Sequence, residues 1–319
     1  MGLALFSSKP SAFAAFPGLG DDHTPSLGRF ELVVNPLFHA FLDGSSYPGW
    51  DSCNQRLLSP TLYDPNTVIG RSAPFLAGSS ADLLGTPVGT RGTIVSDSSF
   101  GIVPPEVNGP AGTREVHTEI ASLNLIGGGA AVRAGTRAPG RPLSVGEVES
   151  QSPSGNPALD FPASSFFDIF VEVDLPVIGT LYNTTPLVVK NTSLTAFPPK
   201  VIYVHGNSSA VPLFFENDNP FLGAHAGDIF GILMLAGHGV NMSIENESEL
   251  AEFENEVETE VDPEYEGWVP DLRIVPEPST PLVLLAGLVA LAATSARAGA
   301  VGVNPKFRRK GNETADFAD

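Results

Sequence analysis

Cysteine and cationic residues are scarce in this chain. A single cysteine, Cys53, stands among 319 residues, so no disulfide within the chain can hold the fold together. Lysine and arginine number 17 against 36 aspartate and glutamate, which gives a formal net charge of −19. A chain this acidic repels phosphate backbones, and the composition therefore excludes nucleic acid as a partner.

Several sequence patterns are also lacking. No sustained helical period precedes Pro281, and no Gly-x-Ser-x-Gly elbow occurs anywhere. The stretch Val204-His205-Gly206 is similar to the oxyanion-side turn of α/β-hydrolases, but without the elbow and the crossover helices serine hydrolysis is excluded. Residues 1–16 contain no continuous apolar leader, so we expect the true start of the protein to lie upstream of Met1.

Short strands separated by turns are the main structural signal. The chain has 33 glycines and 29 prolines, which suit strands and turns better than helices. Between Phe167 and Leu175, apolar and mostly polar residues alternate, as in a strand with one buried face. Further strands are predicted at Phe30–Val34, Thr93–Ser96, Val116–Leu125, Leu187–Lys190, Val201–His205, Val211–Glu216, Ile229–Leu235 and Val240–Ile244.

These signals predict an all-β fold, an antiparallel β-sandwich with long Gly- and Pro-rich loops. We place this domain at residues 29–244, after a disordered N-terminal segment at residues 1–28. Gly127-Gly128-Gly129 follows an apolar strand without a phosphate-loop lysine, and it predicts a hairpin or a bulge.

An acidic stretch follows the predicted domain. Eleven of the 22 residues from Glu245 to Glu266 are Asp or Glu, with no Lys or Arg. Charges of one sign at this density repel one another, so we interpret residues 245–274 as a solvated spacer. The functional alternative is weak multivalent Ca²⁺ binding, although the EF-hand spacing is lacking. No other cofactor is predicted.

The C-terminal region reads as a break, an apolar run and a basic cluster. Pro276, Glu277 and Pro278 precede an uncharged run from Pro281 to Ala296. At ~1.5 Å per residue, these 16 residues fall short of a ~30 Å hydrocarbon core, whereas residues 281–303 suffice with Arg297 near the headgroups. We therefore predict one transmembrane helix at 281–303. The orienting cations that follow it are Arg308, Arg309 and Lys310.

This arrangement resembles the PEP-CTERM sorting tail of bacterial envelope proteins. The resemblance covers residues 275–310 and leaves a polar extension at 311–319. It implies that Pro276, Glu277 and Pro278 are recognised by an exosortase-type processing enzyme, with the membrane as a second partner. The implied location is the cell envelope, anchored or released outside the cell after processing, and exopolysaccharide is a partner by analogy only.

One stretch carries candidate metal ligands. On a strand, Glu115, His117 and Glu119 point to one face, and carboxylate and imidazole groups are metal ligands. Same-face neighbours are about 7 Å apart, so further ligands have to come from elsewhere, with His205 and Asp168 as candidates. The alternative is a polar outer face with cross-strand ion pairs that include Arg114. Histidines without spaced partners, such as His225 and His238, are expected in the core or in turns.

Three functions remain open. The preferred hypothesis is an exported surface or matrix protein with a structural or interaction role and no enzymatic activity. The first alternative is a carbohydrate-binding module of the extracellular matrix, which requires exposed aromatic rings. The second is a metal-dependent hydrolase that uses His117. The aromatic candidates for the first alternative are Tyr47, Trp50, Tyr182 and Tyr203.

Overall fold

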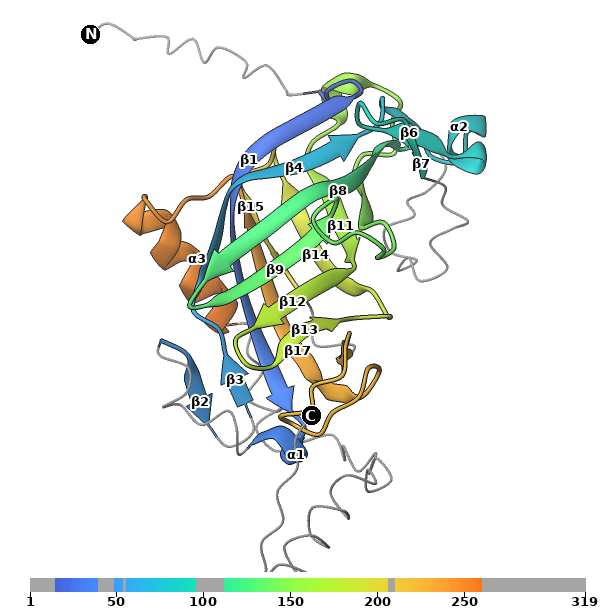
Figure 1. Ribbon diagram of the computed structural model, residues 1–319. Coiled ribbons are helices and arrows are strands. Elements are labelled where there is room, and N and C mark those ends of the chain that lie inside the picture. The colour runs from blue at the N-terminus through green and yellow to red at the C-terminus, as the bar shows by residue number, and fades with distance from the viewer. Residues whose placement is uncertain (1–14, 40–48, 54–55, 96–111, 206–209, 260–319) are drawn as a thin grey trace, which may run out of the picture. The chain divides into compact units, whose positions relative to one another are not determined.

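A computed structural model describes residues 15–39, 49–53, 56–95, 112–205 and 210–259 (Figure 1). All of them belong to the first of the two units into which the chain divides, Met1–Ile274. This part of the chain is mostly antiparallel β-sheet with few helices, as the sequence predicts.

Most elements are short to medium strands joined by turns. The strands are β1 (Gly20–Val34), β2 (Asp51–Cys53), β3 (Arg56–Leu58), β4 (Leu62–Arg71), β5 (Phe75–Leu76), β6 (Thr86–Val88), β7 (Thr93–Val95), β8 (Arg114–Gly127), β9 (Ala130–Gly135), β10 (Val145–Ser150), β11 (Ala163–Ile169), β12 (Val171–Leu175), β13 (Gly179–Tyr182), β14 (Leu187–Leu194), β15 (Val201–Val204), β16 (Val211–Phe215) and β17 (Ile229–Val240). The helices are α1 (Pro36–His39), α2 (Ser80–Leu84), the 3₁₀ helix η2 (Pro157–Leu159) and α3 (Glu247–Thr259).

The main sheet closes on itself. Hydrogen-bonded neighbours follow the ring β8, β10, β11, β14, β15, β17, β1 and β4, and β4 pairs with β8 again. Two long strands act as branch points. β8 pairs with β10 through residues 115–119 and with β9 through 122–127, and β17 pairs with β1, β15 and β16. Closure gives each of these strands a hydrogen-bonded neighbour on both sides, with β14 and β15 joined through the pair of Lys190 and Val204.

The expected two-sheet sandwich is not confirmed, because the ring strands belong to one continuous sheet. Both arrangements place every second residue of a strand in a core, so the alternation that we used cannot distinguish them. The difference depends on which strands pair across the ring, and local sequence patterns do not report such long-range pairing.

The buried apolar face predicted between Phe167 and Leu175 is confirmed, but the opposite face, which was expected to be solvated, also contains the buried residues Asp168 and Glu172. Phe167, Ile169, Val171, Val173 and Leu175 all belong to the main hydrophobic cluster. They lie on two strands, β11 and β12, because the chain changes partners at Phe170. There the Ser144 hydroxyl accepts a hydrogen bond from the Phe170 backbone N–H at 2.9 Å.

The triple-glycine turn is a hairpin, as predicted. Gly127 of β8 pairs with Ala130 of β9, and Gly128 and Gly129 connect them with φ of 54° and 82°. Positive φ at both central residues is the conformation that glycine adopts at little cost.

Part of the predicted acidic spacer is instead the packed helix α3. Asn246 caps its first turn, where the Asn246 Oδ1 accepts from the Ser248 N–H at 3.2 Å. Phe253 and Val257 are fully buried and pack with Leu27 of β1 against the sheet. Their spacing places them on one helical face, so the apolar residues outweigh the repulsion between the exposed acids. Residues 260–274 lie outside the described part of the chain.

The predicted disordered segment at 1–28 is also partly ordered. β1 begins at Gly20, and its polar residues pair with β4 as far as Arg71. Arg71 forms an ion pair with Asp22 at 2.5 Å, which shows how a polar stretch joins the sheet. Residues 1–14 lie outside the described residues.

The predictions for the C-terminal tail fall outside the described residues as well. These are the helix at 281–303, the recognition residues Pro276, Glu277 and Pro278, and the cations Arg308, Arg309 and Lys310. Among the helices in the described ranges, none has the length and apolar character that a membrane crossing requires.

Candidate functional site

The predicted metal ligands share a face but are covered. Glu115, His117 and Glu119 are at most 1% exposed, whereas the alternative reading expected a wet outer face. Residues of the β5–β7 region lie over them. The Phe75 and His117 rings pack edge to face with their centroids 4.8 Å apart, and Thr86 Oγ1 lies 2.8 Å from His117 Nδ1.

Within the described ranges, no three His, Cys, Asp or Glu side chains are placed to hold one metal ion. Glu119 instead forms an ion pair with Arg91. The two further candidates are also buried. His205 Nδ1 lies 2.8 Å from the Val188 carbonyl oxygen, and burial raises the pKa of Asp168 to about 6. Arg114 was predicted to form a cross-strand ion pair. Its Nε instead lies 2.7 Å from Oδ1 of Asp160, which lies outside the strands.

The aromatic rings considered for carbohydrate binding do not form an exposed face. Trp50 and Tyr203 are buried, and Tyr47 lies outside the described residues. Tyr182 is half-buried beneath Arg141, whose guanidinium carbon lies 4.1 Å from the ring centroid. The flat aromatic platform that carbohydrate binding requires is therefore not found among the three described rings.

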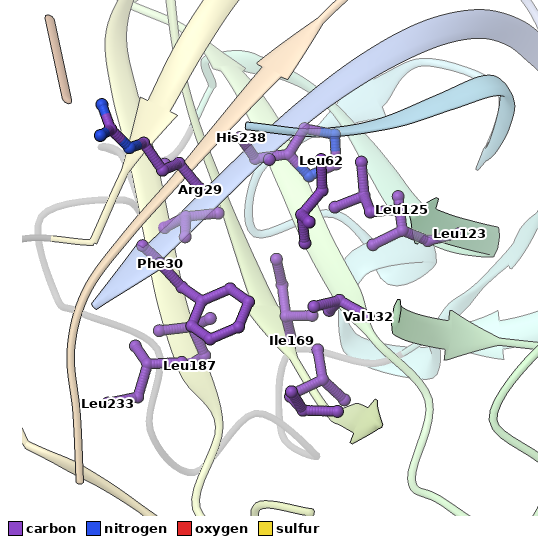
Figure 2. Close-up of a pocket in the computed structure, with 16 residues that line it drawn as sticks. Arg29, Phe30, Leu62, Leu123, Leu125, Val132, Ile169, Leu187, Leu233 and His238 are labelled. Carbon is purple, nitrogen blue, oxygen red and sulfur yellow. The ribbon is translucent and has the colours of Figure 1, made fainter. Parts of the chain in front are cut away.

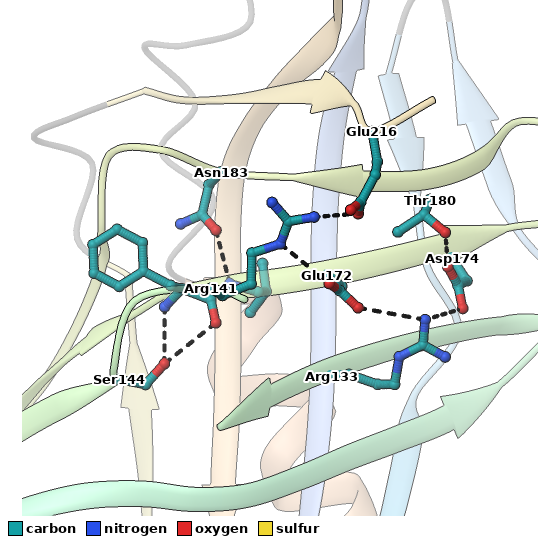
Figure 3. Close-up of polar contacts among 10 residues, drawn as sticks. Arg133, Arg141, Ser144, Glu172, Asp174, Thr180, Asn183 and Glu216 are labelled. Atoms are coloured by element: carbon teal, nitrogen blue, oxygen red, sulfur yellow. Dashed lines mark hydrogen bonds and ion pairs between the residues drawn. The ribbon is translucent and has the colours of Figure 1, made fainter. Parts of the chain in front are cut away.

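Arg141, which lies over the Tyr182 ring, also belongs to an ion-pair network. Figure 3 shows this network around Arg141 and Arg133. Arg141 contacts Glu172 at 3.1 Å and also pairs with Glu216. Arg133 lies 3.7 Å from Glu172 on its other side and pairs with Asp174. The acids are matched by arginines on the same face, so the network links β9, β12 and the end of β16 rather than presenting unpaired charge.

The interior of the closed sheet contains an apolar cavity of about 50 Å³ (Figure 2). Branched aliphatic side chains from strands around the ring make up most of its wall. The lining residues include Leu62, Leu125, Ile169, Val171, Leu187 and Leu233, together with Ala236 and His238 of β17. The cavity is therefore built by strands of the main sheet and not by a surface loop.

The alternation of β17 explains how its residues line the cavity. Leu235 belongs to the cluster under α3, and a Cβ on Gly237 would lie 2.3 Å from Val257 Cγ2 of that helix. Ala236 and His238 therefore face the opposite way, into the ring.

Gly28 of β1 keeps part of this space open. It pairs with His238, and a Cβ built on Gly28 would lie 2.4 Å from Leu125 Cδ1. A side chain here would therefore push Leu125, which itself lines the cavity. Glycine at this position therefore leaves space between β1 and the Leu125 side chain of β8.

His238 is the polar group that reaches this cavity. It is 7% exposed, and in the described part of the chain its Nε2 atom has no hydrogen-bonding partner. Burial lowers the pKa of His238 to about 4, although the negative charge of Asp64 opposes the shift, so the imidazole is neutral at neutral pH.

Arg29 also borders the cavity, but its charge is directed elsewhere. Its Nε donates to the Ser59 carbonyl at 3.2 Å, and its Nη1 pairs with Glu258 of α3 at 2.8 Å. Figure 2 shows the guanidinium pointing away from the labelled leucines. The cavity thus has apolar walls and one neutral polar contact.

Sequence reasoning placed His238 in the core or a turn but did not find the cavity. The available signal was the pair Gly237 and Gly239 on either side of His238, which breaks the apolar pattern of a strand without a turn. We read it as a loop between two strands, and so missed that His238 faces inward.

Comparisons with known proteins add little to this description. No family of known proteins and no curated protein matches the chain. Among solved structures, the chain is similar to DynF from the dynemicin biosynthesis pathway of Micromonospora chersina. The identity is 16%, the TM-score is 0.42, and the match covers 74% of this chain and 86% of that one. A likeness this distant supports no functional argument.

Proposed function

We propose that the β unit binds a small, slender and mainly apolar molecule inside the closed sheet. The observation that carries this proposal is the cavity of about 50 Å³, lined by β1, β4, β8, β11, β14 and β17 of the ring together with β9 and β12. Space that side chains leave unfilled in a core costs about 24 cal/mol per Å³, or roughly 1 kcal/mol here. A ligand that fills the space recovers this cost and buries its own apolar surface.

The size of the cavity limits the ligand. An engineered apolar cavity of about 150 Å³ accommodates benzene, so about 50 Å³ suits the end of an aliphatic chain rather than a whole molecule of that volume. No catalytic group is required for this function.

Methyl NMR with n-pentane as the probe tests the proposal. We expect saturable shifts of the methyl groups of Leu125, Ile169 and Leu187, and none at the exposed Leu84 and Val177. Their absence, or equal shifts at the exposed methyls, would contradict binding in the cavity.

Filling the cavity supplies the matched control. Ala236→Val adds two methyl groups from β17 at a lining position and keeps a residue that favours strands. We expect this variant to remain folded and to lose the pentane-dependent shifts. Retention of the wild-type affinity would place the ligand elsewhere.

From the tail sequence we also propose that this unit is displayed at a bacterial envelope, or released there, as an interaction protein. The support is the combination of Pro276, Glu277 and Pro278 with the basic cluster at 308–310. The test is export of the full chain behind a signal peptide in a host with exosortase-type enzymes. We expect retention or cleavage that deletion of 275–319 abolishes, and identical secretion of both forms would refute the proposal.

A further inference from the structure

The cavity has a polar end as well as apolar walls. His238 Nε2 is buried within a wall otherwise dominated by leucine, isoleucine and valine. The neighbouring inner residue Tyr203 does not satisfy it, since the Tyr203 hydroxyl donates to Ser165 Oγ at 3.1 Å. Buried polar groups are normally hydrogen-bonded, so this nitrogen calls for a partner.

A lone water is a poor partner at this position. An ordered buried water usually makes about three hydrogen bonds, whereas Arg29 and His238 are the two lining residues with polar side chains. The Arg29 guanidinium is already bound to Ser59 and Glu258. A ligand that brings one polar atom and an apolar body matches the wall better.

The charge around the cavity selects against ions. Burial lowers the pKa of His238, so its ring offers a hydrogen bond and no positive charge near neutral pH. The Asp64 carboxylate is the nearby charge that acts on His238, and it repels anions. Moving an ionised group into apolar surroundings without a partner of opposite charge is strongly unfavourable.

We infer that the site takes an uncharged molecule with a slender apolar body and one hydroxyl or carbonyl group, which hydrogen-bonds to His238 Nε2. This inference rests on the proposed function and adds the chemical class of the ligand. The bond forms in either histidine tautomer, because a hydroxyl can donate to a bare Nε2 and a carbonyl can accept from a protonated one.

Three matched probes test the assignment: n-pentane, 1-butanol and butanoate. The first two have equal numbers of heavy atoms and differ in the hydroxyl. We expect His238→Leu to weaken 1-butanol binding by about tenfold while n-pentane binding is unchanged or tighter. His238→Gln, which keeps a polar terminus, should recover part of the lost affinity. Butanoate should bind wild-type protein more weakly than 1-butanol does.

The ¹⁵N chemical shift of His238 Nε2 in the wild-type protein gives a readout that does not depend on a variant folding. It should move on addition of 1-butanol and not of n-pentane. If n-pentane binds but neither the nitrogen shift nor the variant distinguishes the alcohol, the inference fails and the proposed function stands. Butanoate binding equal to that of the alcohol also overturns the inference. If no probe binds saturably, the proposed function fails together with the inference.

Discussion

At the scale of single residues, two buried titratable side chains have opposite effects on stability. His238 has a pKa lowered to about 4, so acidification below its ordinary value of 6.5 favours the unfolded chain. Asp168 has a pKa raised to about 6, so the folded form gains relative stability as the pH falls from about 6 towards 3.8. Between about pH 4 and pH 6 the two effects partly cancel.

Removing the Asp168 carboxylate should reveal the effect of His238 on the pH dependence of stability. In Asp168→Asn, which cannot ionise, we expect stability to fall more steeply on acidification than in the wild type. The remaining His238 contribution amounts to up to about 3 kcal/mol. Urea unfolding from neutral pH down to about pH 4 measures this difference. Parallel stability curves for the two proteins would show that Asp168 does not titrate as its burial implies.

Arg141 illustrates how the shape of a charged side chain, and not only its charge, can stabilise the fold. Its guanidinium contacts Glu172 and Glu216 and lies over Tyr182. In Arg141→Lys the charge remains but the planar fork is lost, so we expect a loss of about 1 kcal/mol in the free energy of unfolding. Arg137→Lys is the matched control, because Arg137 makes one exposed contact with Ser122 Oγ at 3.3 Å. Equal effects of the two substitutions in urea unfolding would be evidence against this role.

At the scale of elements, the packing of α3 depends on glycine in β17. A Cβ on Gly237 would lie 2.3 Å from Val257 Cγ2, and one on Gly239 would lie 3.1 Å from Phe253 Cδ2. Strand glycines normally weaken a sheet, but here they allow the helix to approach it closely. This close approach buries Phe253 and Val257 completely.

A double-variant cycle tests this contact. We expect Gly237→Ala to cost about 1–3 kcal/mol by overpacking, and Val257→Ala to make room for the added methyl group. The double variant should therefore lose less stability than the sum of the single variants. Gly18→Ala is the control, since no atom lies within 4 Å of a Cβ at that glycine. Strict additivity in chemical denaturation would show that α3 does not press on β17.

The sequence predicts best those elements in which the local residue pattern directly reflects burial or turn conformation in the folded protein. The glycines of the β8–β9 hairpin identify their turn directly, whereas the alternation from Phe167 to Leu175 identifies the buried apolar residues but not the break between β11 and β12. Helix α3 was missed because eleven acids in the 22 residues from 245 to 266 hide the apolar positions Phe253 and Val257. β4 was missed because Asp64, Pro65 and Asn66 interrupt its apolar alternation.

At the scale of the whole molecule, the closed ring is the feature that the sequence could not supply. Ring closure depends on pairs such as Ser26 with Val240, which are distant in the chain. The cavity depends in turn on how strands from the whole length of the unit face one another. The inward orientation of His238 can be inferred only once that strand pairing is known. The same holds for the space beside Gly28.

Xenon binding in a crystal of the full chain tests the central claim most directly, since xenon enters small apolar cavities without a polar contact. We predict an anomalous peak inside the ring, between Leu125, Ile169 and Leu187, in the wild type. The same peak should be lost or strongly reduced in Ala236→Val. Xenon bound only outside the ring, or an interior peak of equal occupancy in the variant, would contradict a ligand-accessible cavity within the closed sheet.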